Sequence, residues 1–529
     1  MVNKLRAYIQ SIIRDEQAVF SAVLVIMAVI LGTVVRLNFI SGTDFPVNDG
    51  GLFYQMVEDL IDNNFHLPMF TAYNLDQIPF AYPPLAFYLI GFIKSLTGIS
   101  LFSLLRYVPV LISVSTIIAF YSLARTVISD DLLPAIAALF FALIPRTFEW
   151  FVMGGGITRS LGFLFATLAI QSIWAMYLGR KGHSVIMRTA LFSGLTVLSH
   201  PETALFVVFC AVVMLLYHGI SKDRIWKSMA VAAGVLVIIS PWITAVALNH
   251  GLAPFTSAGG TGHSLWFEIK NLLTLKFGFE NGEFLSIFSG LTLIAVISRK
   301  DKLTWLLFGI LIFGYLLFPR SGPNILTIWV GLLAALGFFE LVGLASGRPD
   351  GERDLAQNLA ENGKSKAVFV LVIMYMFLGA YTYKYIYGKA QLHITDEIQA
   401  AFEFLGENSD KDDLFLIYPS IEDNRFWWND YLSEWFPVLA DRRSVTTVQG
   451  YEWVPDVFNK KIVSYIQLRS CEDTGPVCVR SWEIENGNQI DYLIIDTEDN
   501  RPDFANSFEM DANYDMFYDD GRLLVFKKK

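Results

Sequence analysis

Long apolar runs recur along the chain up to about residue 386, separated by short polar connections. Most runs have the length of roughly 17 to 25 residues with which an α-helix crosses a hydrocarbon core of about 30 Å. We therefore predict eleven membrane-spanning helices. They cover residues 18–38, 104–127, 132–146, 158–178, 189–200, 203–218, 228–249, 284–297, 303–318, 325–345 and 367–386.

Two more apolar segments lie in residues 39–103, which connect the first two spans. We predict that residues 84–97 and the amphipathic segment 50–63 are juxtamembrane helices lying in the membrane interface. Counting 84–97 as a span would move every later basic connection to the outside, against the positive-inside rule. Two surface helices in one loop indicate a docking floor for a lipidic molecule.

Basic residues fall in alternate connections, which predicts a cytoplasmic N-terminus and an extracytoplasmic tail. No cleavable signal peptide is expected. The basic groups are Lys4, Arg6 and Arg14; Arg125; Arg180, Lys181 and Arg188; Lys222, Arg224 and Lys227; Arg299, Lys300 and Lys302; and Arg348, Arg353, Lys364 and Lys366. Pro201, in SHPET, breaks two spans apart at the outer face.

From about residue 390 the pattern changes, so the chain divides into a helical membrane module, 1–389, and a C-terminal α/β domain, 390–529. The alternating runs DLFLIYPS and QIDYLIIDT predict strands, and helices are expected near 394–407 and 453–466. Cys471 and Cys478 can close a small disulfide loop in an oxidising compartment. Cys210, inside a span, is interpreted as a packing residue.

Composition agrees with this division. A chain with 54% hydrophobic and 17% charged residues is no ordinary soluble protein. Its net charge of −10 argues against nucleic acid as a partner. The bilayer itself is the expected surroundings.

The predicted topology collects ionisable residues at the outer face, where charged groups at membrane depth tend to mark function. They are Asp44, Asp49, Arg146, Glu149, Arg159, His200, Glu202 and Arg320. Each has an ordinary alternative: a solvated carboxylate, a snorkelling arginine, a histidine at a helix end, or a glutamate that favours a helix N-terminus. Asp49 stands between Asn48 and Gly50-Gly51, where the backbone can approach a ligand closely.

A carboxylate beside several cations suits the transfer of a group from a phosphate leaving group. The carboxylate takes the proton of an attacking hydroxyl, and arginines stabilise the departing phosphate. In the tail, RFWWNDYLSEWFPVLADRR concentrates Trp427, Trp428, Tyr431 and Trp435. These rings suit stacking on a sugar, or they form the core of the tail or rest at the membrane interface. Glu434 and Arg443 are candidates to reach the same cleft.

The order of several motifs resembles the GT-C superfamily of integral-membrane glycosyltransferases. The motifs are NDGG at Asp49, YPPL at Tyr82, LLRYVPVLISVSTIIAFYSLAR at 104–125, GGGITRSLGF, LSHPETALF, FPRSGPN and SEWFPVLADRR. The resemblance implies a polyprenyl-phosphate-linked sugar as donor and an extracytoplasmic glycan, lipid or protein as acceptor. It implies inversion at the anomeric carbon at the outer face of a prokaryotic cytoplasmic membrane.

The same resemblance implies roles for individual residues. Asp49 is the candidate catalytic base, and Arg159, Arg320 and His200 are the candidate donor-phosphate ligands. Candidate substrate-binding or supporting residues are Asp44, Tyr82, Glu202, Glu434, Trp435 and Arg443.

Many relatives have two adjacent acidic residues where this chain has Asp49-Gly50, and His66, His250 and His263 are scattered. We therefore expect no obligatory metal or other cofactor; a divalent cation finds no support in the ligand spacing.

Two other classes of protein are weighed against an enzyme. A transporter or flippase for a lipid-linked glycan would show internal repeats and broken helices meeting at mid-membrane. We detect no repeat, and the polar residues gather at one surface. A non-catalytic, polysaccharide-binding membrane scaffold would keep the aromatic tail and tolerate loss of Asp49.

Overall fold

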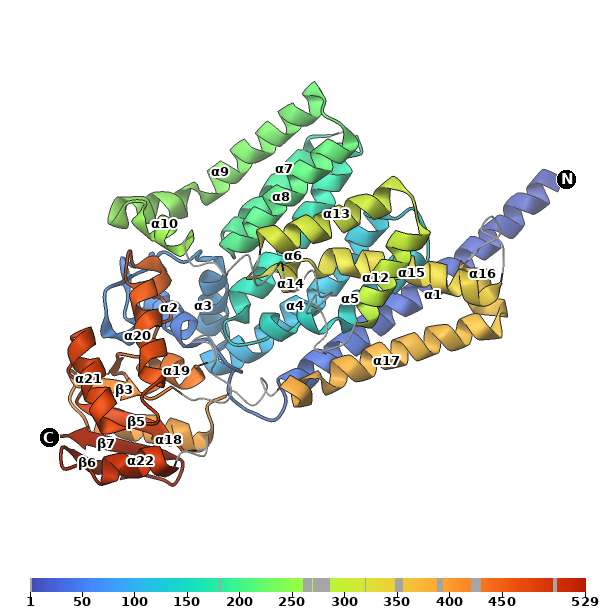
Figure 1. Ribbon diagram of the computed structural model, residues 1–529. Coiled ribbons are helices and arrows are strands. Elements are labelled where there is room, and N and C mark those ends of the chain that lie inside the picture. Colours follow the sequence, from blue (N-terminus) through green and yellow to red (C-terminus); the bar gives the residue numbers. More distant parts are fainter. Residues whose placement is uncertain are drawn as a thin grey trace.

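A computed structural model describes residues 2–179, 182–259, 269, 286–318, 320–347, 355–387, 393–419, 430–497 and 502–529. A bundle of long helices makes up most of it, and a sheet with flanking helices lies at the end away from the N-terminus (Figure 1). The bundle consists of α1 (Val2–Phe39), α4 (Leu101–Val127), α5 (Leu133–Leu143), α6 (Gly156–Tyr177), α7 (His183–Val197), α8 (Pro201–His218), α9 (Lys222–His250), α12 (Ile287–Ser298), α13 (Lys302–Leu317), α15 (Thr327–Ser346) and α17 (Gly363–Tyr387). Shorter helices in this part are α10 (Ala253–Gly259), α14 (Gly322–Ile325) and α16 (Leu355–Glu361).

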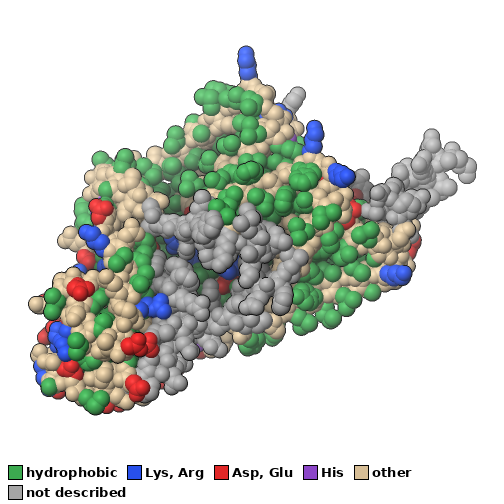
Figure 2. Space-filling model, in the orientation of Figure 1, with side chains coloured by type: hydrophobic (Ala, Val, Ile, Leu, Met, Phe, Trp, Pro, Cys, Tyr) green, Lys and Arg blue, Asp and Glu red, His purple; other side chains and the backbone are tan. Residues whose placement is uncertain are grey.

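Each of the eleven predicted spans coincides with a helix, although the described residues begin at 286 in the span expected at 284–297. Within the described ranges, seven helices are long and apolar enough to cross a membrane, or eight if the bent segment after α5 is included. This is therefore a multi-pass membrane protein; a total of eleven spans stays a prediction. Figure 2 shows hydrophobic side chains spread over the bundle and charged side chains gathered over the sheet region.

One predicted span needs a correction. Residues 132–146 do not form one straight helix, because α5 ends at Leu143 and the chain turns by 85° into residues 145–151. Pro145 stands at the turn, and a proline disfavours helical backbone in the residue before it. Every residue of α5 is buried, as expected for a helix enclosed by others.

The connection between α1 and α4 contains α2 (Gly51–Asp62) and α3 (Leu85–Thr97), so both predicted juxtamembrane segments are helical. Between them lie β1 (Phe70–Thr71), η1 (Tyr73–Leu75) and β2 (Ile78–Pro79). With 13 residues, α3 is roughly 20 Å long and too short for a span. Placement of both helices in the membrane interface stays a prediction.

The tail is built around a mixed sheet. Its strands are β3 (Leu414–Ile417), β4 (Arg443–Ser444), β5 (Tyr492–Asp496), β6 (Tyr514–Asp519) and β7 (Leu523–Lys528), in the order β4-β3-β5-β7-β6. β3 is parallel to β4 and β5, whereas β7 is antiparallel to β5 and β6. The helices are α18 (Asp396–Glu407), α19 (Tyr431–Leu439), α20 (Phe458–Arg469), α21 (Pro476–Asn486) and α22 (Pro502–Glu509), with η7 (Tyr451–Trp453).

Alternation along the strands gives this sheet two buried faces. Phe415, Tyr492 and Val525 pack in one core together with α18, α19 and residues of the connection between α1 and α4. Their neighbours Leu416 and Leu493 pack on the other face, against α20, α21 and α22. The tail thus has a core of its own on one face and shares a core with the first connection on the other.

The predicted strands and helices of the tail are confirmed by β3, β5, α18 and α20. Cys471 and Cys478 form a disulfide between α20 and α21. Cys210 is buried in the bundle core, as its interpretation as a packing residue requires.

Candidate active site

Asp49 lies where the chain turns from α1 toward α2. Its neighbours have backbone angles on the left-handed side, with φ of 58° at Asn48 and 138° at Gly50. Asparagine tolerates such angles better than most residues, and glycine adopts them readily. The NDGG motif therefore forms a sharp turn that presents one carboxylate just before the first turn of α2.

The Asp49 side chain is held from both sides. Its Oδ2 lies 2.7 Å from Nη2 of Arg159, and its Oδ1 accepts a 2.9 Å hydrogen bond from the backbone N–H of Gly155. Both partners come from the start of α6 or the residue before it. The two side chains retain 16% and 23% exposure for Asp49 and Arg159, so a substrate can reach the ion pair.

The glycine run ahead of Arg159 is what allows this approach. A Cβ on Gly155 would lie 2.5 Å from Asp49 Oδ2, and one on Gly154 would collide with the backbone oxygen of Asp49. Contacts this short are excluded for any side chain, so these positions require glycine. The GGGITR motif thus brings the Asp49 carboxylate against the α6 terminus.

Arg159 is itself fixed in place. Its Nε donates to the carbonyl of Trp150 at 3.0 Å, and its guanidinium lies 5.4 Å from the centre of the Trp150 ring. The Trp150 and Asp49 bonds engage two of the five guanidinium N–H donors. The remaining donors suit an anionic group beside Asp49.

The tail contributes to the same turn through α19. Glu434 accepts a 2.9 Å hydrogen bond from the N–H of Gly50, and the indole N–H of Trp435 donates to the carbonyl of Asn48 at 2.8 Å. Tyr73 donates to the Glu434 backbone carbonyl at 2.7 Å. The two tail residues therefore bracket Asp49 along the chain and hold the turn that carries it.

Glu434 is an unusual carboxyl group because it is only 4% exposed. Burial raises its pKa well above the ordinary carboxyl value, and the negative charge of Asp49 raises this pKa further. The Gly50 N–H and the charge of Arg159 oppose that rise. The raised pKa favours the neutral form of Glu434, which limits its repulsion with the Asp49 carboxylate.

A second flank of the site contains Tyr82, His200 and Arg320. Tyr82 lies 3.3 Å from the hydroxyl of Thr158, and the charges of Arg159 and Arg320 both act on its phenol. The same two arginines act on His200, whose Nδ1 accepts from the N–H of Thr203 and so caps α8. Arg320 is exposed between α13 and α14.

Glu452 belongs to this second flank. Burial raises the pKa of Glu452, whereas Arg320 and the Gly450 N–H lower it. Its side chain accepts from Gly450 at 2.8 Å. Direct contacts thus join Asp49, Arg159, Glu434 and Trp435. Charge interactions connect the second group, which consists of Tyr82, His200, Arg320 and Glu452.

Three candidate residues lie elsewhere. Asp44 is fully exposed and forms a 3.0 Å ion pair with Arg106. Arg443 is half-exposed and pairs with Asp76 at 3.0 Å. Glu202 lies partly exposed in the first turn of α8, where a negative charge favours a helix N-terminus.

Two of the four aromatic residues singled out in the tail lie within the described residues, and both are buried. Trp435 is fully buried, and its ring packs edge-on against Phe45 at 4.7 Å. Tyr431 is also buried in the shared core. For these two rings the structure agrees with the packing interpretation, whereas Trp427 and Trp428 lie outside the described residues.

Sequence reasoning did not single out Gly155, Trp150 or Glu452. For Gly155 the sequence did carry a signal, the run of three glycines before Arg159. Such a run allows another segment to approach the backbone closely. Trp150 and Glu452 had no such signal, since both stand in three-residue 3₁₀ turns far from Asp49 along the chain.

Within the described ranges, no group of three or more His, Cys, Asp or Glu side chains is arranged to hold a metal ion. Both carboxylate oxygens of Asp49 already face donors, Arg159 and the Gly155 N–H.

No protein-family model matches the chain, and no curated protein matches its sequence. Solved structures do match. The archaeal oligosaccharyltransferase AglB from Archaeoglobus fulgidus, in complex with an inhibitory peptide and a dolichol-phosphate, has a TM-score of 0.58 at 14% identity, over 96% of this chain and 74% of that one. ArnT from Cupriavidus metallidurans, bound to undecaprenyl phosphate, has a TM-score of 0.56 at 12% identity, over 96% of this chain and 97% of that one.

The arabinofuranosyltransferase AftD from mycobacteria matches as well, with a TM-score of 0.55 at 13% identity, over 97% of this chain and 40% of that one. All three neighbours are GT-C glycosyltransferases. This chain has the GT-C fold. The resemblance read from the order of its motifs is thereby confirmed at the level of fold, including the sheet-containing tail of the GT-C architecture.

Proposed function

We propose that this protein is a membrane glycosyltransferase that moves a sugar from a polyprenyl-phosphate donor to an extracytoplasmic glycan, lipid or protein. The GT-C fold supports the reaction class, and solved neighbours contain dolichol-phosphate or undecaprenyl phosphate. The observation that carries the proposal is the partly exposed Asp49–Arg159 pair, with the charges of Arg159 and Arg320 converging on Tyr82 and His200.

In the proposed reaction, a hydroxyl or amide of the acceptor attacks the anomeric carbon of the donor sugar. The new bond forms as the bond from that carbon to the phosphate oxygen breaks, and its electron pair leaves with the polyprenyl phosphate. Asp49 takes the proton of the acceptor. Arg159 and Arg320 bind the phosphate as its negative charge grows, and a single displacement inverts the anomeric carbon.

His200 and Tyr82 complete the donor side of this proposal. Because Nδ1 of His200 accepts from Thr203, the neutral ring carries its proton on Nε2, a donor for a phosphate oxygen. Tyr82 offers a hydroxyl on which the charges of both arginines act. Glu434 and Trp435 act indirectly, by holding the turn that presents Asp49.

The proposed orientation places the N-terminus in the cytoplasm and this site outside, in a prokaryotic cytoplasmic membrane. The basic connections support the first statement. The Cys471–Cys478 disulfide supports an oxidising compartment for the tail. We propose further that no divalent cation is required, so activity should survive dialysis against a chelator; loss of activity restored by added Mg²⁺ or Mn²⁺ would overturn this.

The decisive test measures release of polyprenyl phosphate by the purified protein from a panel of polyprenyl-phosphate sugars. Asp49→Asn should lower release by roughly 10²- to 10⁴-fold, the usual contribution of a general base, with donor binding retained. Asp44→Asn is the matched control, since the same change on the exposed carboxylate leaves the site intact. Equal release by wild type and Asp49→Asn would show that Asp49 is not the catalytic base. Saturable donor binding without any release would favour a scaffold or transporter.

A further inference from the structure

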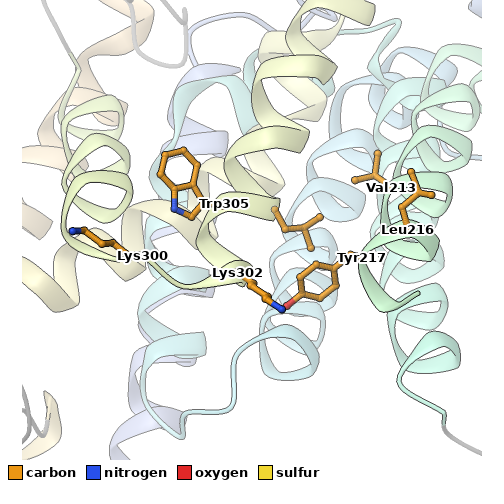
Figure 3. Close-up of a pocket in the computed structure, with 7 residues that line it drawn as sticks. Val213, Leu216, Tyr217, Lys300, Lys302 and Trp305 are labelled. Atoms are coloured by element: carbon orange, nitrogen blue, oxygen red, sulfur yellow. The ribbon is translucent and has the colours of Figure 1, made fainter. Parts of the chain in front are cut away.

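A hollow lies far from Asp49, between the end of α8 and the start of α13. It has a volume of about 480 Å³, and its walls include Val213, Leu216 and Tyr217 from α8, and Lys300, Lys302 and Trp305 from the other side (Figure 3). His200 and Tyr217 lie at opposite ends of α8, separated by roughly 25 Å at 1.5 Å per residue. The hollow is therefore on the other membrane face from the candidate active site.

Two cations at the rim of this hollow are not neutralised. Lys300 and Lys302 are exposed, and among the described residues neither has a hydrogen bond or an ion pair. The nearby carboxylates are engaged by Arg299, which lies 3.0 Å from Asp301 and 3.3 Å from Glu340. Asp301 also caps α13, by accepting from the N–H of Thr304.

The same hollow has the lining expected at the boundary of a bilayer. Trp305 and Tyr217 remain 51% and 38% exposed, although both are large rings. Figure 3 shows the side chains of Lys302 and Tyr217 pointing toward each other. Leu216 directly precedes Tyr217 in α8, and Val213 lies one helical turn before it. The two rings suit the headgroup level of a bilayer, the apolar residues suit the acyl chains, and the lysines suit the phosphate. This order of side chains matches the polarity profile of a phospholipid.

We infer that this hollow binds an anionic phospholipid of the surrounding bilayer. Its phosphate is held by Lys300 and Lys302, its glycerol region lies at the level of Tyr217 and Trp305, and an acyl chain follows Val213 and Leu216. Basic hollows between membrane helices on the cytoplasmic side suit such headgroups. The inference does not depend on the proposed transferase activity.

The test titrates the detergent-solubilised protein with phosphatidylglycerol and counts bound lipid by native mass spectrometry, with phosphatidylcholine of the same chains as the neutral reference. Wild type should prefer phosphatidylglycerol, and each of Lys300→Gln and Lys302→Gln should weaken that preference about fivefold. The matched control is Lys364→Gln with Lys366→Gln, which removes two exposed lysines at the start of α17. The control should bind as wild type does.

Location is tested separately, with brominated phosphatidylglycerol as a quencher of tryptophan fluorescence. Wild type should lose a component of fluorescence that Trp305→Phe lacks. Equal binding of both lipids, an unchanged preference in both Lys300→Gln and Lys302→Gln, or no Trp305 component would each overturn the inference. So would displacement of the lipid by inorganic phosphate or a stronger preference for undecaprenyl phosphate, since the ligand would then be a free anion or the donor carrier.

Discussion

Asp44 and Asp49 stand five residues apart in the same connection. Asp44 faces solvent, whereas Asp49 is enclosed by residues from other parts of the chain. Asp44 is fully exposed and pairs with the Arg106 side chain. Asp49 is held by Arg159 and the Gly155 N–H, while Glu434 and Trp435 fix the residues on either side of it. Both carboxylates pair with an arginine, so the ion pair itself does not distinguish them.

The difference lies in how far along the chain the partners come from. The enclosure of Asp49 joins three segments, namely the turn just before α2, the start of α6 and α19 in the tail. Exposed ion pairs are usually worth little, because water screens them and both side chains lose freedom. A carboxylate with fixed donors on several sides keeps one orientation, which a catalytic base requires.

The sharpest way to break the enclosure is Gly155→Ala. The added Cβ would lie 2.5 Å from Asp49 Oδ2, so the carboxylate has to move. A displacement of about 1 Å at a reacting group lowers turnover by roughly 10²-fold, and we expect that loss in kcat with the melting temperature little changed. Gly290→Ala is the control, because a Cβ there meets nothing within 4 Å. Full activity in Gly155→Ala would show that Asp49 needs no close support.

Trp435→Phe should have the next largest effect, on stability. The change removes the indole N–H that reaches the Asn48 carbonyl, and leaves that carbonyl without this partner in a buried place. We expect a loss of about 1 to 3 kcal/mol in the free energy of unfolding, measured by thermal or denaturant unfolding of the tail. Trp226→Phe, on an exposed ring of α9, should change nothing. Equal stability of the two variants would mean that the tail holds the turn by other contacts.

Glu434→Gln should change the melting temperature least at low pH, and the difference from wild type should grow as pH rises. The folded-state pKa of Glu434 lies above its unfolded value of 4.5, so its stabilising contribution is complete below pH 4.5 and is lost as pH rises through the folded pKa. Glutamine stays neutral and still accepts from Gly50. The melting temperature of the variant should therefore fall less than that of wild type from about pH 4.5 upward.

The matched control for this pH profile is Glu407→Gln, an exposed carboxyl at the end of α18. Its melting curve should follow wild type at every pH. Parallel profiles for wild type and Glu434→Gln would indicate that Glu434 is ionised in the folded protein, against the argument from burial.

The sequence predicted those elements whose hydrophobic residues follow a regular pattern. Apolar runs of span length located the helices of the bundle, and strict alternation located β3 and β5. The bend after α5 escaped because residues 132–146 are uniformly apolar up to Pro145, and hydropathy alone does not register an 85° turn. The amphipathic pattern of residues 50–63 was enough to predict α2, since its buried positions repeat with helical spacing.

The site was predicted in part for the same reason. Asp49 and Arg159 stood in unusual glycine contexts, and these two do meet. Arg443 stands nine residues after Glu434 but follows the strand direction of β4 toward Asp76. Glu434 and Arg443 both contact the first connection across more than 300 positions, at Gly50 and at Asp76. No local pattern shows which of the two lies beside Asp49, which is why they were expected to behave alike.

The shared core between the tail and the first connection also sets an order of events during biosynthesis. Glu434 and Trp435 follow α17 in the chain, and Trp435 packs in the same core as Phe45, so the support of Asp49 is assembled only after the bundle helices have been made. A nascent chain already inserted in the membrane, with α1 to α17 in place, still lacks the residues that fix its carboxylate. The turn that carries Asp49 is therefore fixed only once the tail has been made and has folded against the first connection.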